Sequence, residues 1–327
     1  MSNKTLFLII ISLCLLALSP LAAQVSTPLP NRVAREEGID STSIPPSDRG
    51  LTPKPRTDRQ GGESVGGESV ESTTYPWLVR QGITAMEDDS LMLAERLFKL
   101  AMREAPSAHT NAILWSHLAS IHERTGREQE ALEDYKQALA IAPGTTGILL
   151  SRASLYLKLG NEDRALADYD EVLQQQPDHQ EALLMRAYIK QRKRLLKEAR
   201  ADYEHLLRLQ PTHEQALLGL ALVNNEGRRP QEAMETINRA IDLYPTHAAG
   251  YALRAGMEFE RKLYELAELD YGMAIDLDPT NVSYRLARAS FYTKTKRKRL
   301  AREDVREAAR LGASPAEVAG AAGYKIK

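Results

Sequence analysis

From Tyr75 onward, small and apolar residues recur along the chain with a period of 34 residues after one longer first interval. One series of small residues comprises Gly82, Ala119, Ala153, Ala187, Ala221, Ala255 and Ala289. A second series comprises Ala94, Ala131, Ala165, Ala199, Ala233, Ala267 and Ala301. Prolines keep the same phase at Pro106, Pro143, Pro177, Pro211, Pro245 and Pro279. Three markers with one phase predict a repeated structural unit.

Each unit has the pattern of two packed α-helices. Small residues let two helices approach closely, because the distance between helix axes depends on the side chains at the contact. A bulky residue lies four positions after each late alanine, on the same helical face, and fills the space that the alanine leaves. These residues are Phe98, Tyr135, Tyr169, Tyr203, Ile237, Tyr271 and Val305. The proline ends the second helix, and Gly126, Gly160 and Gly227 mark turns inside individual hairpins.

This pattern resembles the tetratricopeptide repeat family, whose unit is a helix-turn-helix of 34 residues. The family pattern is matched best by Trp115, Leu118-Ala119, Ala131, Tyr135, Ala138 and Pro143. The resemblance implies an all-α, right-handed α-solenoid of seven repeats with a short C-terminal capping helix. The repeats lie at 75–108, 112–145, 146–179, 180–213, 214–247, 248–281 and 282–315, and a cap or tail follows at 316–327.

Two departures from the family pattern predict local changes. Three extra residues separate the first two units, which implies an altered turn around His109. The last unit has Ala313 in place of its proline, as expected of a terminal repeat that stops stacking. Ser314 and Pro315 then resemble the cap and first turn of the closing helix.

Residues 1–23 have the layout of a secretory signal peptide. Lys4 precedes an apolar run that ends at Leu18, and small residues follow up to Ala23. We expect export to the periplasm or secretion, with cleavage after Ala23; an uncleaved N-terminal membrane anchor is the alternative. Cys14, the only cysteine, lacks the small residues that a lipoprotein signal needs before its cysteine, because Leu13 precedes it. The mature chain would then contain no thiol, which excludes disulfides and cysteine nucleophiles.

Residues 24–74 are rich in Pro, Gly and Ser and include the tandem sequence Gly-Gly-Glu-Ser-Val at 61–65 and 66–70. Apolar residues are too sparse there to bury a core that would offset the entropy of the chain. We expect a disordered linker. It either gives the folded part reach or is an unselected tail.

By the same resemblance, the first helix of each repeat lines a concave groove that binds a peptide or a partner's helix. The matching positions here are Leu150, Ser154, Leu184, Tyr188, Leu218, Leu222, Ala252, Phe259, Leu286 and Ser290. This surface is apolar, so it does not match the charged clamp with which some family members hold a terminal carboxylate. Tyr188 and Phe259 are the expected anchors, since aromatic residues dominate binding energy. The alternative for the leucines is that they are stacking core.

A second candidate surface is basic. The turns inside the later hairpins carry Arg192, Lys193, Arg194, Arg228, Arg229, Arg261, Lys262, Lys296, Arg297, Lys298 and Arg299. Because these turns recur at one place in each unit, we expect them to form an edge, called here the basic rim. It would contact an anionic component such as an acidic protein, lipid head groups or an envelope polymer. The alternative is a solvated edge that aids solubility.

Recurring charged and titratable residues have structural explanations. Arginines recur in the first helices at Arg152, Arg186, Arg254 and Arg288, and aspartates follow sixteen residues later at Asp168, Asp202, Asp270 and Asp304. In the fifth unit Leu220 and Thr236 replace both, so we expect Arg–Asp pairs that tie the two helices of a hairpin. Asp134, which lacks such an arginine, is expected to reach Arg152. His179, His213 and His247 stand a whole hairpin apart, too far to share a metal ion.

These observations predict a non-catalytic scaffold that binds another protein. No catalytic, phosphate-binding or dinucleotide motif is present, and we expect neither a cofactor nor a metal. Lys and Arg number 43 against 44 Asp and Glu, so the charge balance does not indicate a nucleic-acid partner. The leading hypothesis is an adaptor of the cell envelope. The alternatives are a surface protein that binds anionic lipid or polysaccharide through the basic rim, or an accessory subunit of a secretion or assembly complex. The oligomeric state is left undetermined.

Overall fold

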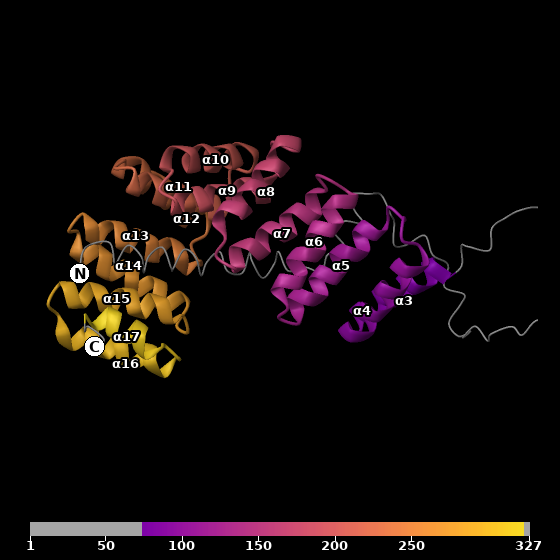
Figure 1. Cartoon of the computed structure of the whole chain (residues 1–327). Helices are drawn as coiled ribbons and strands as arrows, with labels where there is room; N and C mark the ends of the chain where they lie inside the picture. The colour runs from indigo at the N-terminus through magenta and orange to yellow at the C-terminus, as the bar shows by residue number, and fades with distance from the viewer. Residues whose placement is uncertain (1–73, 324–327) are drawn as a thin grey trace, which may run out of the picture. The chain divides into compact units, whose positions relative to one another are not determined.

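The structure, a computed structural model, describes residues 74–323, which form fifteen α-helices and no strand (Figure 1). The helices are α3 Thr74–Glu87, α4 Leu91–Glu104, α5 Asn111–Arg124, α6 Glu128–Ile141, α7 Thr146–Lys158, α8 Glu162–Gln175, α9 Gln180–Arg192, α10 Leu196–Leu209, α11 Glu214–Glu226, α12 Pro230–Leu243, α13 Ala248–Glu260, α14 Tyr264–Leu277, α15 Val282–Lys294, α16 Lys298–Arg310 and α17 Pro315–Ala322. The expected signal peptide lies outside the described residues, as does the expected linker except for Thr74. The all-α prediction is confirmed.

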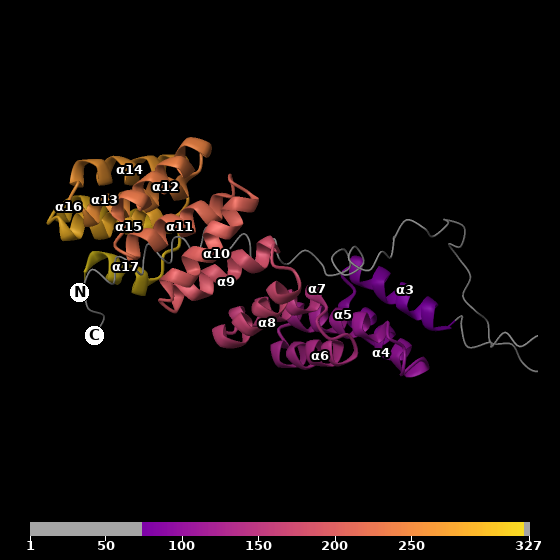
Figure 2. The same ribbon diagram turned by 90° about the horizontal axis from the view of Figure 1, so that it is seen from above.

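The described residues divide between two compact units, one with α3–α7 and one with α8–α17. Consecutive helices are numbered here as hairpins one to seven in chain order, from α3 with α4 to α15 with α16. Within the two units, hairpins one, two and four to seven are packed pairs. Hairpin three is divided between the units, because α7 belongs to the first and α8 to the second. Within the second unit, α12 to α16 pack in sequence order, and α17 covers α15 and α16 (Figure 2). No helix among residues 74–323 is both long and apolar enough to cross a bilayer.

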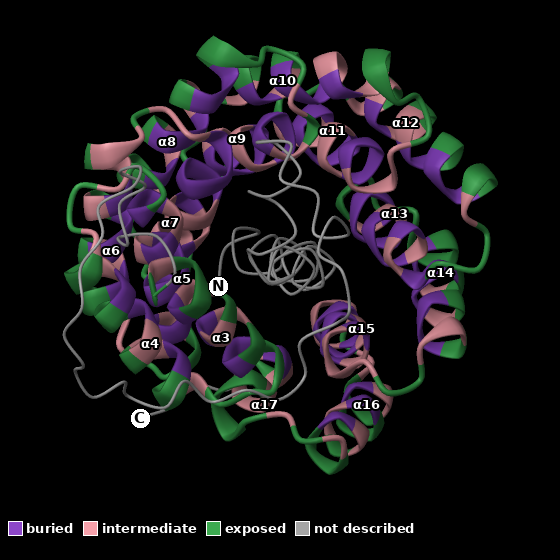
Figure 3. Cartoon of the chain, turned by 90° about the vertical axis from the view of Figure 1, so that its right-hand side faces the viewer, coloured by how far each residue is buried: buried purple, intermediate pink, exposed green. Residues whose placement is uncertain are grey.

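The cores of the hairpins form where the small residues meet the bulky ones, as predicted. The small residues from Ala119 to Ala289 are fully buried, and so is Phe98. Figure 3 shows buried positions on the helix faces that meet inside the hairpins of each unit and exposed positions at the turns. Gly82 is required in hairpin one, because a Cβ there would lie 2.4 Å from the Phe98 ring.

The turn inside each hairpin is closed by a left-handed residue. In hairpin four, Arg194 has φ 64°, and the Leu195 amide donates to the Lys190 carbonyl at 2.9 Å, which is the Schellman pattern of a helix end. Gly126 and Gly160 occupy the equivalent position, with φ of 73° and 74°. Gly227 lies in the turn of hairpin five, as predicted; its φ is −77°, and Arg228 is the left-handed residue there.

The turns between hairpins combine a helix stop with a helix cap. Each second helix from α4 to α14 ends two residues before its proline. The rings of His179 and His213 then accept hydrogen bonds from the first turns of α9 and α11, as Asn281 does for α15. The three-residue insertion is closed by buried Asn111, whose amide donates to the Ala105 carbonyl at 2.7 Å.

The closing helix is also confirmed. Ser314 and Glu317 form a reciprocal capping box at the start of α17.

Arg–Asp pairs tie the helices of hairpins four, six and seven, as predicted. Each pair is bidentate, with nitrogen–oxygen distances between 2.6 and 2.9 Å, and the pairs are Arg186–Asp202, Arg254–Asp270 and Arg288–Asp304. Arg152 and Asp168 lie in different units.

Hairpin two uses a histidine in place of the arginine. His122 Nδ1 lies 2.6 Å from Asp134 Oδ2, and both side chains are buried. His122 stands on the packed helix of the same hairpin and gives Asp134 a partner that the sequence analysis did not consider. The contact of Asp134 with Arg152 stays a prediction.

Candidate functional site

The residues predicted to line a groove fall into two groups. Eight are buried: Leu150, Leu184, Tyr188, Leu218, Leu222, Ala252, Leu286 and Ser290. Their burial agrees with the alternative in which such positions are stacking core. Tyr188 is only 9% exposed, so it offers little surface as an anchor. Ser154 and Phe259 are partly exposed. A ligand-binding role for this surface stays a prediction.

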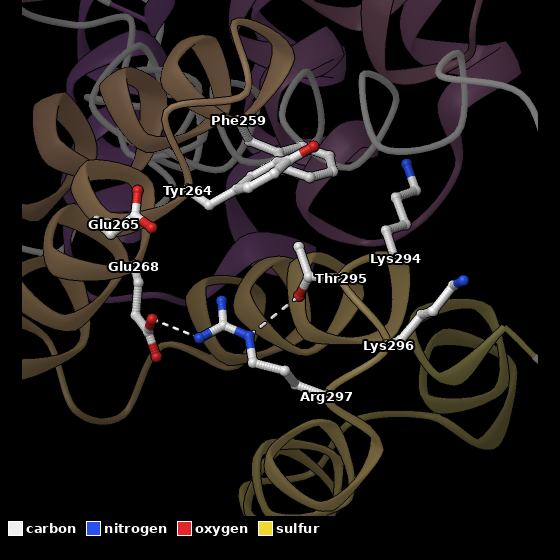
Figure 4. Close-up of a pocket in the computed structure, with 8 residues that line it drawn as sticks. All are labelled: Phe259, Tyr264, Glu265, Glu268, Lys294, Thr295, Lys296 and Arg297. Atoms are coloured by element: carbon white, nitrogen blue, oxygen red, sulfur yellow. Dashed lines mark hydrogen bonds and ion pairs between the residues drawn. The ribbon is translucent and has the colours of Figure 1, made fainter.

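A pocket of about 430 Å³ lies beside Phe259, where hairpins six and seven meet (Figure 4). Its aromatic wall consists of Phe259 at the end of α13 and Tyr264 at the start of α14, with ring centroids 6.0 Å apart. The turn from α15 to α16 forms the facing wall and contributes Lys294 to Arg297. The pocket therefore joins one residue of the predicted groove to two of the predicted basic rim, Lys296 and Arg297.

Lys294 supplies an unmatched charge to this pocket. Its ammonium nitrogen is buried and has no hydrogen-bond partner among residues 74–323. The nitrogen lies 5.7 Å from the centroid of the Phe259 ring, within range of a cation–π contact. Burial lowers the pKa of this ammonium, and the charge of Glu260 opposes that effect. An anionic group entering the pocket would give Lys294 the partner that it lacks.

The opposite side of the pocket is internally paired. Arg297 donates to Glu268 at 2.5 Å and lies 4.7 Å from the centroid of the Tyr292 ring. The Tyr292 hydroxyl also donates to Glu268, at 2.9 Å. Burial would raise the pKa of Glu268, but the hydrogen bonds from Arg297 and Tyr292 hold it below its ordinary value. The charges on this side are therefore matched, whereas the Lys294 ammonium has no hydrogen-bond partner among residues 74–323.

The other residues of the basic rim are exposed. They fall into two groups, those that form an ion pair and those that do not. Ion pairs are formed by Arg192 with Glu162, Lys193 with Asp163, Arg194 with Glu226, Arg229 with Glu232 and Arg299 with Glu303. Among residues 74–323, no ion pair is formed by Arg228, Arg261, Lys262, Lys296 or Lys298. The basic rim therefore carries positive charges that form no ion pair on hairpins five to seven.

Three residues of the basic rim have an unfavourable backbone conformation. Arg228, Lys262 and Lys296 adopt φ between 59° and 64°, a region that disfavours residues with a Cβ. Hairpins two and three use glycine at this position. We expect Arg228→Gly to raise the free energy of unfolding by about 1 kcal/mol. Urea unfolding of both proteins, followed by circular dichroism, checks this; a stability equal to or below that of the wild type would contradict it.

Sequence reasoning missed Tyr264 and did not single out Lys294. Both differ from their counterparts in other repeats. Tyr264 stands where hairpins four, five and seven have Leu196, Pro230 and Lys298, and Lys294 stands where hairpin six has Glu260. A comparison of the repeats position by position would have found these residues. It would not have shown that they face one another.

Two sequence models, both described as tetratricopeptide repeat, match the chain, one at residues 80–145 and 184–248 and the other at 124–187. Together they span residues 80–248 without a gap, just over half of the chain. No match was found among curated proteins.

Among solved structures, the chain is similar to a tetratricopeptide repeat protein from Parabacteroides merdae ATCC 43184, with 27% identity and a TM-score of 0.67, over 76% of this chain and 98% of that one. PilW, a type IV pilus biogenesis factor, has 17% identity and a TM-score of 0.52, over 64% and 96% of the two chains. The Cut9–Hcn1 complex has 15% identity and a TM-score of 0.54, over 78% and 53%. The last two likenesses concern the fold alone.

Proposed function

Because the chain belongs to the tetratricopeptide repeat family, we propose that it is a protein-binding scaffold of the cell envelope that holds a partner at the pocket between hairpins six and seven. The fold supports binding of a protein partner, since stacked helical hairpins present extended surfaces. The location rests on the signal-like residues 1–23. The chemistry of the partner follows from the pocket.

The observation that carries this proposal is the buried, unpaired ammonium of Lys294 beside two accessible aromatic rings. An exposed loop of the partner with a carboxylate next to an apolar side chain fits this pair of features. The carboxylate would bind Lys294 and Lys296, and the apolar side chain would pack on Phe259 and Tyr264. A pocket of about 430 Å³ has the size of a small-ligand or side-chain site.

We expect Phe259→Ala to weaken partner binding about 30-fold, because loss of an aromatic anchor costs about 2 kcal/mol. Lys294→Met, which keeps the length of the side chain and removes its charge, is expected to weaken binding about tenfold or more. The tagged protein and its variants are cross-linked in cells, the envelope fraction is isolated, and captured proteins are quantified by mass spectrometry. The partner's affinity is then measured with purified components.

Lys298→Met is the matched control, since it removes one exposed charge from the neighbouring helix outside the pocket. A partner held by the pocket is lost from both pocket variants and kept by this control. Capture that is unchanged in both pocket variants would refute the site. Capture that survives Phe259→Ala but is lost in high salt would favour the basic rim and an anionic envelope component. Recovery of the protein only from the cytoplasm would refute the envelope location.

A further inference from the structure

Helix α14 exposes an apolar stripe on the side away from its own hairpin core. Leu266, Leu269 and Met273 are spaced to share one helical face and are 49%, 63% and 37% exposed. The opposite face is buried through Ala267, Tyr271 and Ala274. A helix that is apolar on two faces has one face in excess of what its own core needs.

The repeats themselves show that this stripe is not a requirement of the fold. Helix α12 of hairpin five occupies the equivalent place, and there the four outward positions are Glu232, Glu235, Asn238 and Arg239. In α14 they are Leu266, Leu269, Gly272 and Met273. An added Cβ at Gly272 would meet nothing within 4 Å, so the packing of this chain does not demand a glycine there. A glycine in a helix interior destabilises the helix, but it lets another backbone approach closely.

Two charges near the ends of α14 are unfavourable to its own dipole, whereas Glu265 in the first turn is favourable. Lys262 precedes the positive N-terminal end, and exposed Asp276 lies in the last turn, at the negative end. Neither side chain forms an ion pair among residues 74–323. Both charges would be favourable beside a second helix of opposite direction that carried the same sequence.

We infer that α14 is the interface of a symmetric homodimer, in which the α14 helices of two copies pack antiparallel about Leu269. In this register, Leu266 of each copy lies over Gly272 of the other copy, and Met273 packs beside the Leu269 pair. Lys262 of each copy then faces Asp276 of the other, so the contact forms two identical ion pairs. The self-complementary charges identify a second copy as the occupant, because a two-fold axis requires each patch to match itself.

The test uses the purified protein in sedimentation equilibrium over a range of micromolar concentrations. We expect a reversible dimer in the wild type. Leu269→Glu and Gly272→Asn, which install the α12 residues, are each expected to raise the dimer dissociation constant at least tenfold. Both positions are exposed on α14, so circular dichroism should show folded proteins. The outward position Glu235→Gln on α12 serves as a matched control and should leave the dimer unchanged.

Charge-reversal variants at Lys262 and Asp276 distinguish a homodimer from binding of any other partner to α14. Lys262→Glu alone and Asp276→Lys alone are each expected to weaken the dimer about tenfold, because each places like charges opposite one another twice. Mixing the two single variants should restore association, since both ion pairs then form between unlike copies. A wild-type protein that is monomeric throughout, or a mixture that does not associate, would overturn the inference. So would a monomer whose capture of another protein is lost in Leu269→Glu, because the stripe would then serve that protein.

Discussion

Replacing Arg254 with Leu is expected to lower the free energy of unfolding by about 3–5 kcal/mol, the usual cost of breaking a buried ion pair from one side. Arg254 donates to both oxygens of Asp270, at 2.6 and 2.9 Å, and the Asp270 side chain is only 6% exposed. Buried Glu258 lies near the same carboxylate; burial and the charge of Asp270 raise the pKa of Glu258 to about 7. Removal of Arg254 therefore leaves an acidic pair without its cation.

The chain provides its own control for this experiment. Hairpin five has Leu220 and Thr236 where hairpin six has Arg254 and Asp270. The double variant Arg254→Leu/Asp270→Thr reproduces that pair, and we expect it to recover most of the lost stability, because the Asp270 carboxylate is removed together with its cation. Unfolding by urea, followed by far-ultraviolet circular dichroism, measures all three proteins. A double variant no more stable than Arg254→Leu would show that the pair is not the cause.

Acidification is expected to destabilise the first unit through His117. This side chain is 3% exposed, stacks on the Phe98 ring with centroids 5.3 Å apart, and has a buried Nδ1 atom without a partner among the described residues. Burial lowers the pKa of His117 from 6.5 to about 4. Between these values the unfolded chain binds a proton that the folded chain does not bind. The contribution of His117 is therefore fully present above pH 6.5 and is lost as the pH falls towards 4, by about 3 kcal/mol in total.

The two tryptophans make this loss measurable, because Trp77 and Trp115 both lie in the first unit. The free energy of unfolding, followed by tryptophan fluorescence, should fall between pH 7 and pH 5 by about 2 kcal/mol more in the wild type than in His117→Leu. His109→Leu, which removes an exposed histidine nearby, is the control. Equal pH dependence in the wild type and His117→Leu would contradict the prediction. The carboxyl of Asp134 acts in the opposite direction, since burial raises its pKa to about 6, so the comparison with the variant is essential.

Repetition made the hairpins predictable. The series from Ala119 to Ala289 and the aromatic residues after each late alanine specified which faces pack, and the structure buries them accordingly. The joint presence or absence of Arg and Asp predicted four Arg–Asp pairs, because residues that pair are lost together, as in hairpin five. Three of them are present as bidentate pairs in the second unit. Gly227 lies in the predicted turn, but its neighbour Arg228 takes the left-handed conformation, although arginine is a poorer choice than glycine there.

The candidate site was predictable only in part. Phe259, Lys296 and Arg297 were identified from the sequence as members of two separate surfaces, and the structure places them around one pocket. Residues of different hairpins meet because each hairpin is rotated relative to the one before it. No residue pattern within a single hairpin specifies this rotation. The burial of Tyr188 and the groove leucines depends on the same rotation.

The sequence by itself thus determined the local elements of this protein: helix positions, the helix faces that pack inside a hairpin, the turns, the caps and the ion pairs within a hairpin. These depend on residues that are close along the chain, and the period of 34 presents them repeatedly. Only the tertiary structure decided which side chains remain accessible after stacking, that the Lys294 ammonium is buried without a partner, and that α14 keeps an exposed apolar stripe. The accessibility of a side chain depends on which surfaces the neighbouring hairpins cover, and this coverage is set by how the hairpins pack.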